Sequence, residues 1–239
     1  MPRVPIPRVP IPRAGLVAIL CLLAAPASAA TPGFVEDFSA GTGGFGGGSA
    51  VAQVGSGGVG GAADPYLTIS NAAVGNLGAF SQGADLVGNL PADGVTGYTF
   101  WLRDTGADDA LEIHVGIGTL SNFWLSFGGF MPPTGSWQQF AVDLGNQNQW
   151  VQIIGTGTFQ SALASSNRIL FRHDVPPLVQ NPNPIAADFG LDRIQVLPAP
   201  SAAAPAISAA GRAALGVLLC AAVALELHRR TARSRAPSA

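Results

Sequence analysis

Hydrophobic and polar side chains alternate with period two along residues 111–117. Leucine, isoleucine and valine occupy the odd positions, and Glu112, His114 and Gly116 occupy the even positions. Such alternation is typical of a β-strand that buries one face and exposes the other to water. The pattern therefore predicts a strand that carries Glu112 and His114 on its polar face.

Short hydrophobic runs of the same kind recur along the chain and are separated by glycine, proline and asparagine, which favour turns. Roughly nine or ten strands with turns between them favour an all-β fold, an antiparallel two-sheet jelly-roll sandwich, over a parallel sheet with crossover helices. The predicted strands cover residues 33–38, 66–71, 78–80, 95–103, 111–117, 123–127, 137–144, 150–155, 167–173 and 191–197.

Two segments between these runs do not follow a strand pattern. Residues 158–165 predict a short helix that the Thr158 hydroxyl caps. Residues 39–61 are rich in glycine, and residues 41–46 match G-x-G-x-x-G, but the match opens no helix and belongs to no βαβ unit. We therefore interpret residues 39–61 as a loop.

Apolar segments at both ends lie outside the predicted sandwich. Three arginines, an apolar run and an Ala-Ser-Ala site predict a cleaved signal peptide over residues 1–30. The sandwich then covers residues 31–198, and a Pro/Ala/Ser linker covers residues 199–206. Residues 207–230 predict a transmembrane helix, which leaves the arginine-rich residues 231–239 in the cytoplasm.

Charge and cysteine content exclude several functions. The whole chain has a net charge of −2, but the predicted sandwich has four arginines, no lysine and thirteen carboxylates, a net charge of −9. Without a basic stripe, nucleic acid is excluded as a partner. Cys21 and Cys220 both lie in the end segments, so the sandwich has no disulfide, no C-x-x-C redox site and no thiolate zinc site.

Three segments of the sandwich resemble the galactose-binding-like jelly rolls. They are FVEDF (34–38), GSWQQFAVDL (135–144) and DFGLDRI (188–194). The closest resemblance is to bacterial domains similar to laminin IV (laminin B) modules, which also approach an early strand through a glycine pair, here residues 60–61. The resemblance implies an antiparallel two-sheet sandwich of a kind that often binds sugars or structural calcium. A fold alone does not specify function.

The C-terminal segment has a resemblance of its own. PAISAAG (205–211), the apolar run and Arg229-Arg230 resemble the PEP-CTERM class of bacterial sorting signals, specifically the IPTL-CTERM variety. That motif has Pro-Thr-Leu-Ser, whereas Ala206 and Ile207 stand at the threonine and leucine positions here. The resemblance implies export across the inner membrane and processing by an exosortase-type enzyme at the cell surface. A single-span anchor that is never processed is the alternative.

Four carboxylates are candidate ligands for a structural calcium ion: Glu36, Asp37, Asp64 and Asp192. In the jelly rolls that this domain resembles, the first and last strands lie side by side. The resemblance thus implies that these carboxylates, with carbonyl groups of the glycine-rich loop, supply the oxygen ligands that calcium prefers. The alternative is that they are solvated acids at strand ends.

A second group of residues is a candidate sugar-binding face. Glu112 and His114 share the polar face of one strand, and Arg103 and Trp124, with Gln139, are expected on neighbouring strands. An indole can stack on the apolar side of a sugar while polar groups bond its hydroxyls. The alternative is that a loop covers Trp124 and that Glu112 and His114 are ordinary surface residues.

No catalytic motif completes these groups. Arg172-His173-Asp174 lies at a strand end, where we expect a salt bridge, and no G-x-S-x-G or H-E-x-x-H is present. The sequence therefore predicts an exported, surface-directed, non-enzymatic β-sandwich that binds carbohydrate or contributes to the extracellular matrix. Two alternatives stay open, a polysaccharide hydrolase with a carboxylate pair and a purely structural surface protein.

Overall fold

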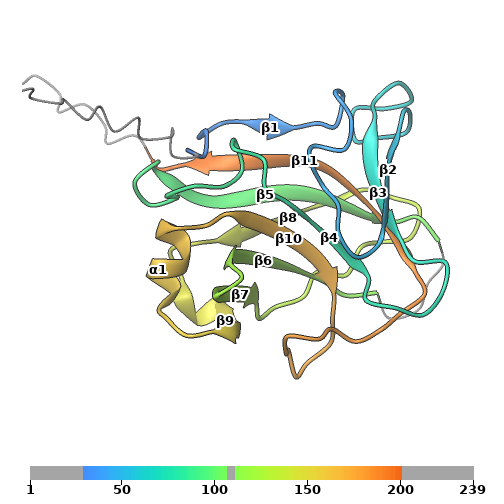
Figure 1. Cartoon of the computed structure of the whole chain (residues 1–239). Coiled ribbons are helices and arrows are strands. Elements are labelled where there is room, and N and C mark those ends of the chain that lie inside the picture. The colour runs from blue at the N-terminus through green and yellow to red at the C-terminus, as the bar shows by residue number, and fades with distance from the viewer. Residues whose placement is uncertain (1–28, 107–110, 201–239) are drawn as a thin grey trace, which may run out of the picture. The chain divides into compact units, whose positions relative to one another are not determined.

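Two antiparallel β-sheets pack face to face in the computed structural model, which describes residues 29–106 and 111–200 (Figure 1). Both belong to the compact unit Met1–Leu197, which is distinct from a second unit, Pro198–Ala239. Sheet A has the order β2 (Ala50–Val54), β3 (Tyr66–Ser70), β11 (Asp188–Pro198), β5 (Val95–Asp104) and β8 (Gln138–Asp143), and β1 (Val35–Glu36) also pairs with β11. Sheet B has the order β4 (Gly78–Ser81), β10 (Arg168–His173), β6 (Ile113–Thr119), β7 (Asn122–Ser126) and β9 (Trp150–Gly155). The predicted all-β, two-sheet sandwich is confirmed.

The core between the sheets follows from the period-two patterns. Ile113, Val115 and Ile117 of β6 are fully buried, as predicted, and they face the inner side of sheet A. On β5 the inward residues are Tyr98, Phe100 and Leu102, also fully buried, so residues 99, 101 and 103 point to the outer face of sheet A. The Phe100 ring lies 5.0 Å from the Phe171 ring of sheet B, which joins the two layers.

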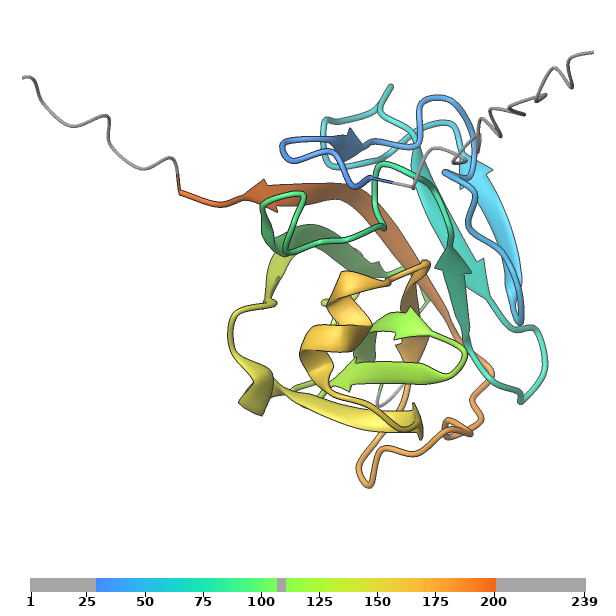
Figure 2. The same ribbon diagram turned by 60° about the vertical axis from the view of Figure 1, so that its left-hand side comes forward.

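One short helix closes an end of the sandwich (Figure 2). It is α1 (Phe159–Ala164), preceded by the 3-10 helix η1 (Gln147–Gln149) and β9. The Thr158 hydroxyl accepts the Ser161 N–H at 3.1 Å, so the predicted helix and its cap are confirmed. Phe159 packs against Trp150 and Trp124, with ring centroids 5.2 and 5.4 Å away, and this contact fixes the helix on the core.

Strand β11 changes its partner along its length. β3 pairs with residues 188–191 and β1 with residues 194–195. Between them, Arg193 has a φ of 47°, a left-handed conformation that non-glycine residues rarely adopt. This backbone twist places Asp192 and Arg193 beside the loop of residues 57–64, which is important for the site described below.

The glycine-rich segment is only partly a loop. Residues 41–46 form turns, with positive φ at Gly41, Gly43 and Gly44, and open no helix, as predicted. Residues 50–54, however, form strand β2, which pairs with β3, so the interpretation of 39–61 as one loop is wrong. The Ala-Val-Ala-Gln-Val sequence is too weakly hydrophobic to predict a strand alone. Its backbone hydrogen bonds to β3 stabilise the strand instead.

The predicted signal peptide, transmembrane segment and basic tail fall almost entirely outside the described residues, in 1–28 and 201–239. Among the residues that the structure describes, none of the helices has the length and hydrophobicity required to span a bilayer.

Candidate functional site

A hollow of about 250 Å³ lies on the outer face of sheet B. We call it the groove. Its floor and walls are mostly apolar, and its polar groups come from two arginines and two amides. The lining residues are Phe80, Leu120, Phe123, Ile153, Ile154, Arg168, Leu170, Arg172, Gln180 and Asn181.

Two glycines of sheet B leave room for side chains that line the groove to lie close to the sheet. Gly116 on β6 pairs with Leu170 on β10 and Leu125 on β7. A methyl group on Gly116 would lie 2.5 Å from Phe123 Cε1, so only glycine allows the Phe123 ring to lie across β6. Gly78 on β4 likewise lies under Arg172, where a methyl group would approach the Arg172 Cβ at 2.6 Å.

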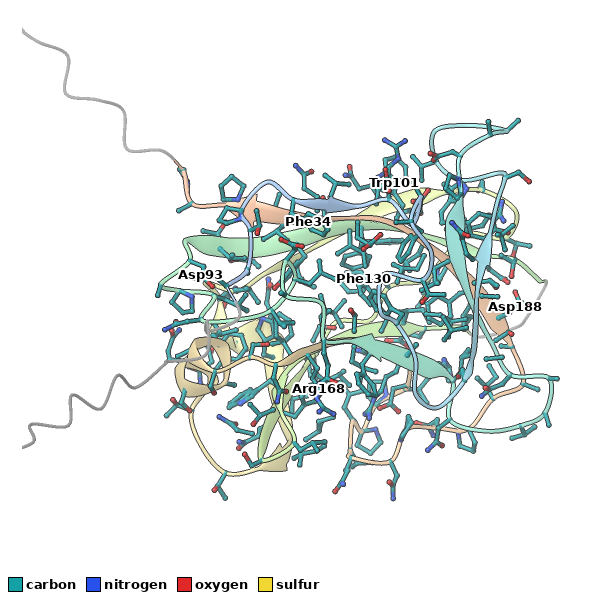
Figure 3. The ribbon with its side chains drawn as sticks, turned by 45° about the horizontal axis from the view of Figure 1, so that its top comes forward. Phe34, Asp93, Trp101, Phe130, Arg168 and Asp188 are labelled. Atoms are coloured by element: carbon teal, nitrogen blue, oxygen red, sulfur yellow. The ribbon has the colours of Figure 1, made fainter. Side chains whose placement is uncertain are left out.

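An arginine lies over an aromatic ring at one side of the groove. Phe80 on β4 is the cross-strand partner of Leu170 on β10. The Arg168 guanidinium carbon is 4.8 Å from the centre of the Phe80 ring, and Arg168 Nε donates to Asn167 Oδ1 at 3.2 Å. Figure 3 shows Arg168 on the outer side of sheet B. Arg168 is partly exposed, and among the described residues it forms no ion pair with a carboxylate.

A buried ion pair stabilises the part of the groove that lies beside Gln180 and Asn181. Arg172 Nη2 contacts Asp174 Oδ2 at 2.5 Å, and the side chains are 6% and 0% exposed. Arg172 Nη1 also donates to the Gln180 carbonyl at 2.9 Å, while Asp174 Oδ1 accepts the N–H of Asn183 at 3.1 Å. The predicted salt bridge at this strand end is confirmed, and it fixes the loop that presents the exposed side chains of Gln180 and Asn181.

Trp124 does not lie on a polar outer face. It points into the core, is 9% exposed and donates its indole N–H to Asn122 Oδ1 at 2.9 Å. Phe123 and Leu125 occupy the outer face instead. The placement predicted for Trp124 is therefore wrong, because all five residues of β7 are buried and its sequence pattern does not distinguish the two faces.

Glu112 lies just before β6 and is only partly exposed, and His114 is on the predicted side of β6 but is covered. His114 is fully buried, and its Nδ1 donates to the Ser126 carbonyl at 2.7 Å. Its Nε2 lies 3.2 Å from Glu112 Oε1 without the alignment of a hydrogen bond. A methyl group on Gly129 would lie 2.0 Å from Glu112 Oε1, so the loop after β7 covers this pair. The pair is not available to a sugar.

Arg103 lies on the other side of the molecule, on the outer face of sheet A. Its guanidinium carbon is 4.7 Å from the Tyr66 ring and 4.8 Å from the Trp137 ring. The four predicted ligand-binding residues therefore occupy three places: the outer face of sheet A, a covered part of sheet B, and the core for Trp124. They do not form one site.

Of the predicted calcium ligands, the structure brings together Asp64 and Asp192. Both carboxylates lie against Gly58, where a methyl group would be 2.8 Å from Asp64 Oδ2 and from Asp192 Oδ2. Asp192 Oδ2 accepts the Val59 N–H at 2.8 Å, and Asp64 Oδ2 accepts the Gly60 N–H at 2.5 Å. Backbone N–H groups thus fill the space between the carboxylates.

Glu36 and Asp37 have other partners. Glu36 accepts the Phe38 N–H at 2.9 Å, and Asp37 accepts the Ser39 N–H at 3.0 Å. Within residues 29–106 and 111–200, no three histidine, cysteine or acidic side chains are grouped closely enough to hold a metal. The four predicted ligands therefore do not fit one calcium site, and calcium binding itself stays a prediction from the sequence.

Burial alters the acidity of several groups. Burial raises the pKa of Asp192 to about 6, against the opposing effect of the N–H groups of Val59 and Arg193. It also raises the pKa of Glu36 and lowers the pKa of His173. Asp37 is different, because hydrogen bonds from Ser39 lower its pKa. None of these groups lines the groove.

The groove residues themselves were not predicted from the sequence. Arg168, Phe80 and Asn181 lie far apart in the chain, and the low floor depends on which glycines face which strands. The one usable signal is the pair of polar residues Gln180 and Asn181 in a proline-rich loop beside a strand end.

No family model matches the sequence, and no curated protein matches it. Among solved structures, the chain is similar to a family 11 carbohydrate-binding module from Clostridium thermocellum in complex with a β-1,3-1,4-mixed-linked tetrasaccharide. The identity is 13%, the TM-score is 0.46, and the match covers 72% of this chain and 98% of that chain. It is also similar to the CBM22-1 xylan-binding domain of Paenibacillus barcinonensis Xyn10C, with 13% identity, a TM-score of 0.44, and coverage of 72% and 100%. At these TM-scores, function has to be inferred from the residues of this chain.

Proposed function

We propose that the domain binds carbohydrate in the groove and catalyses no reaction there. The observation that carries this proposal is the arrangement of Phe80 and Arg168 beside Gln180 and Asn181 over an apolar floor. Sugar rings present apolar faces that pack on aromatic and aliphatic side chains, and hydroxyls that bond to guanidinium and amide groups. A volume of about 250 Å³ is small for a ligand site, so the groove holds a short part of a polymer.

The charge of the groove favours binding over hydrolysis. Glycoside hydrolysis requires two carboxyl groups on either side of the scissile bond. The lining of the groove contains no aspartate or glutamate. The adjacent carboxylates Asp192 on β11 and Asp64 in the loop before β3 lie outside the groove and accept the N–H groups of Val59 and Gly60. A polysaccharide hydrolase is therefore the weaker alternative.

Replacing Arg168 with methionine is expected to reduce polysaccharide affinity about tenfold. Methionine keeps the packing on Phe80 and removes the N–H donors, and one hydrogen bond to a charged group contributes about 1.5 kcal/mol or more. The measurement is affinity electrophoresis of the full chain through gels that contain mixed-linkage β-glucan, xylan, galactan or galactomannan.

The double variant Gln180→Ala with Asn181→Ala should weaken retardation in the same gels, because both side chains are exposed at the rim of the groove. Gln147→Ala, an exposed amide outside the groove, is the matched control. Unchanged retardation of the Arg168 variant, or no retardation of the native chain by any polymer, would remove the groove as a carbohydrate site.

We further propose that this domain is displayed outside the inner membrane, where polysaccharide is its partner. The N-terminal signal and the apolar C-terminal segment support this proposal. Exosortase-type processing predicts a mature C-terminus close to residue 205, and mass spectrometry of the purified native protein measures it. A mature chain that still ends at Ala239 would support a retained anchor instead.

A further inference from the structure

A second polar and aromatic surface lies on the outer face of sheet A. It consists of three partly exposed residues, Trp101 and Arg103 on β5 and Trp137 just before β8, together with Tyr66 on β3, which is buried against Arg103 and Trp137. We call these four residues the aromatic strip. Figure 3 shows Trp101 on the outer side of sheet A, whereas Arg168 lies on the outer side of sheet B. The aromatic strip and the groove therefore face away from each other.

The aromatic strip is rigid because its members are fixed to the sheet and to one loop. Gly190 on β11 makes room for the indole of Trp137, since a methyl group there would lie 2.8 Å from Trp137 Cη2. Trp137 Nε1 donates to the Gly57 carbonyl at 2.9 Å, and Arg103 Nη1 donates to the same carbonyl at 3.4 Å. The Tyr66 and Trp137 rings meet edge to face at 5.2 Å.

Trp101 is the member that is open to a partner. It is partly exposed, lies two residues from Arg103 on the same face of β5, and makes no ring contact among the described residues. Its cross-strand partner on β8 is Gln139, which is exposed. An accessible indole beside an amide and a guanidinium offers one surface for the apolar side of a sugar and several donors and acceptors for its hydroxyls.

The charge of the domain indicates which polymer fits. The predicted sandwich has a net charge of −9, and a polyanion would be repelled. The one cation of the strip, the Arg103 guanidinium, is already engaged, because it lies against two rings and donates to the Gly57 carbonyl. The aromatic strip therefore complements a neutral chain better than an acidic one.

We propose that the aromatic strip is a second carbohydrate-binding surface, for a neutral polysaccharide chain, centred on Trp101 and Gln139. This inference is independent of ligand binding in the groove. If both surfaces bind, their opposite placement allows one domain to bridge two chains. Linked sites would then hold a polymer network together more strongly than either site alone.

Replacing Trp101 with alanine is expected to lower the affinity for neutral polymers about fivefold, because alanine removes the indole on which the apolar side of a sugar would pack. The measurement is affinity electrophoresis of the full chain in galactomannan and in hydroxyethyl cellulose, with alginate as the acidic polymer. Trp101→Phe, which keeps an aromatic plane, should retain most of the affinity. Gln139→Ala, which changes an exposed side chain, should lower it less than Trp101→Ala.

The Arg168→Met variant separates this inference from the function proposed for the groove. If both surfaces bind, each single variant loses part of the affinity and the double variant with Trp101→Ala loses nearly all retardation. If both neutral polymers retard the Trp101→Ala variant as strongly as the native chain, the second surface is overturned, whatever the result for the Arg168 variant. A changed sedimentation coefficient with unchanged retardation would also overturn it, because the aromatic strip would then be a contact between two copies of the chain.

Discussion

Replacing Asp174 with alanine is expected to lower the free energy of unfolding by about 3 to 5 kcal/mol. Asp174 is fully buried, and its carboxylate accepts from Arg172 Nη2 and from the backbone N–H groups of Val175 and Asn183. The alanine variant leaves three donors without their acceptor. The large expected effect comes from Arg172, whose charge stays buried without a counter-ion.

Arg172 cannot avoid this cost by losing its proton. Burial lowers its pKa and the carboxylate of Asp174 opposes that effect, but a guanidinium stays charged in proteins. Urea unfolding followed by tryptophan fluorescence would measure the loss of stability. Asp174→Asn with Arg172→Met removes both charges and keeps an acceptor, so it should be clearly more stable than Asp174→Ala.

The Asp174→Ala variant is also expected to affect ligand binding in the groove. Arg172 and Asp174 hold the loop that carries Gln180 and Asn181, so polysaccharide retardation should weaken even at temperatures where the variant is folded. A loss of stability below about 1 kcal/mol would show that the ion pair is not the main restraint on this loop.

The sequence predicts an element well where one face of a strand is polar. Along β6, Ile113, Val115 and Ile117 alternate with less hydrophobic residues, and their burial was predicted correctly. In β7 the same rule failed, because Phe123 and Trp124 are both large and both buried. Period two identifies a buried face only when the other face is distinct.

The candidate surfaces depend on contacts between distant strands. Arg103 was predicted to bind ligand together with residues of sheet B, but its contacts are Tyr66 and Trp137 on sheet A. The shape of each surface is determined by a glycine, Gly116 in the groove and Gly190 under Trp137. A glycine in a strand signals space without identifying the side chain that fills it, so neither surface could be derived from the sequence.

Asp192 provides the second large effect, a dependence of stability on pH. It is fully buried beside Asp64, it contacts the N–H groups of Val59 and Arg193, and its pKa is raised to about 6. The Arg193 guanidinium contacts Asp64 at 3.4 Å on the exposed side of this pair. The folded protein therefore holds a proton on Asp192 more tightly than the unfolded chain, in which the ordinary value is 3.8.

The sign of the effect follows from this difference. The stabilisation associated with protonated Asp192 is fully present below pH 3.8 and is lost as the pH rises through about 6. Since one pKa unit corresponds to about 1.4 kcal/mol, the total is at most about 3 kcal/mol. Asp192→Asn keeps an uncharged acceptor and can donate to Asp64, so this part of the pH dependence should disappear in the variant.

The decisive quantity is the difference in unfolding free energy between the native chain and Asp192→Asn, measured by urea unfolding from pH 4 to pH 8. Taking the difference cancels the opposing contribution of His173, whose lowered pKa makes stability fall as the pH falls. The native chain should lose about 1 to 3 kcal/mol relative to the variant between pH 4 and pH 7. Asp143→Asn, which removes an exposed carboxylate from β8, is the control for the loss of one charge.

If the difference in unfolding free energy between the native chain and Asp192→Asn stays constant from pH 4 to pH 8, the prediction is wrong. The N–H groups of Val59 and Arg193 would then compensate the buried carboxylate fully.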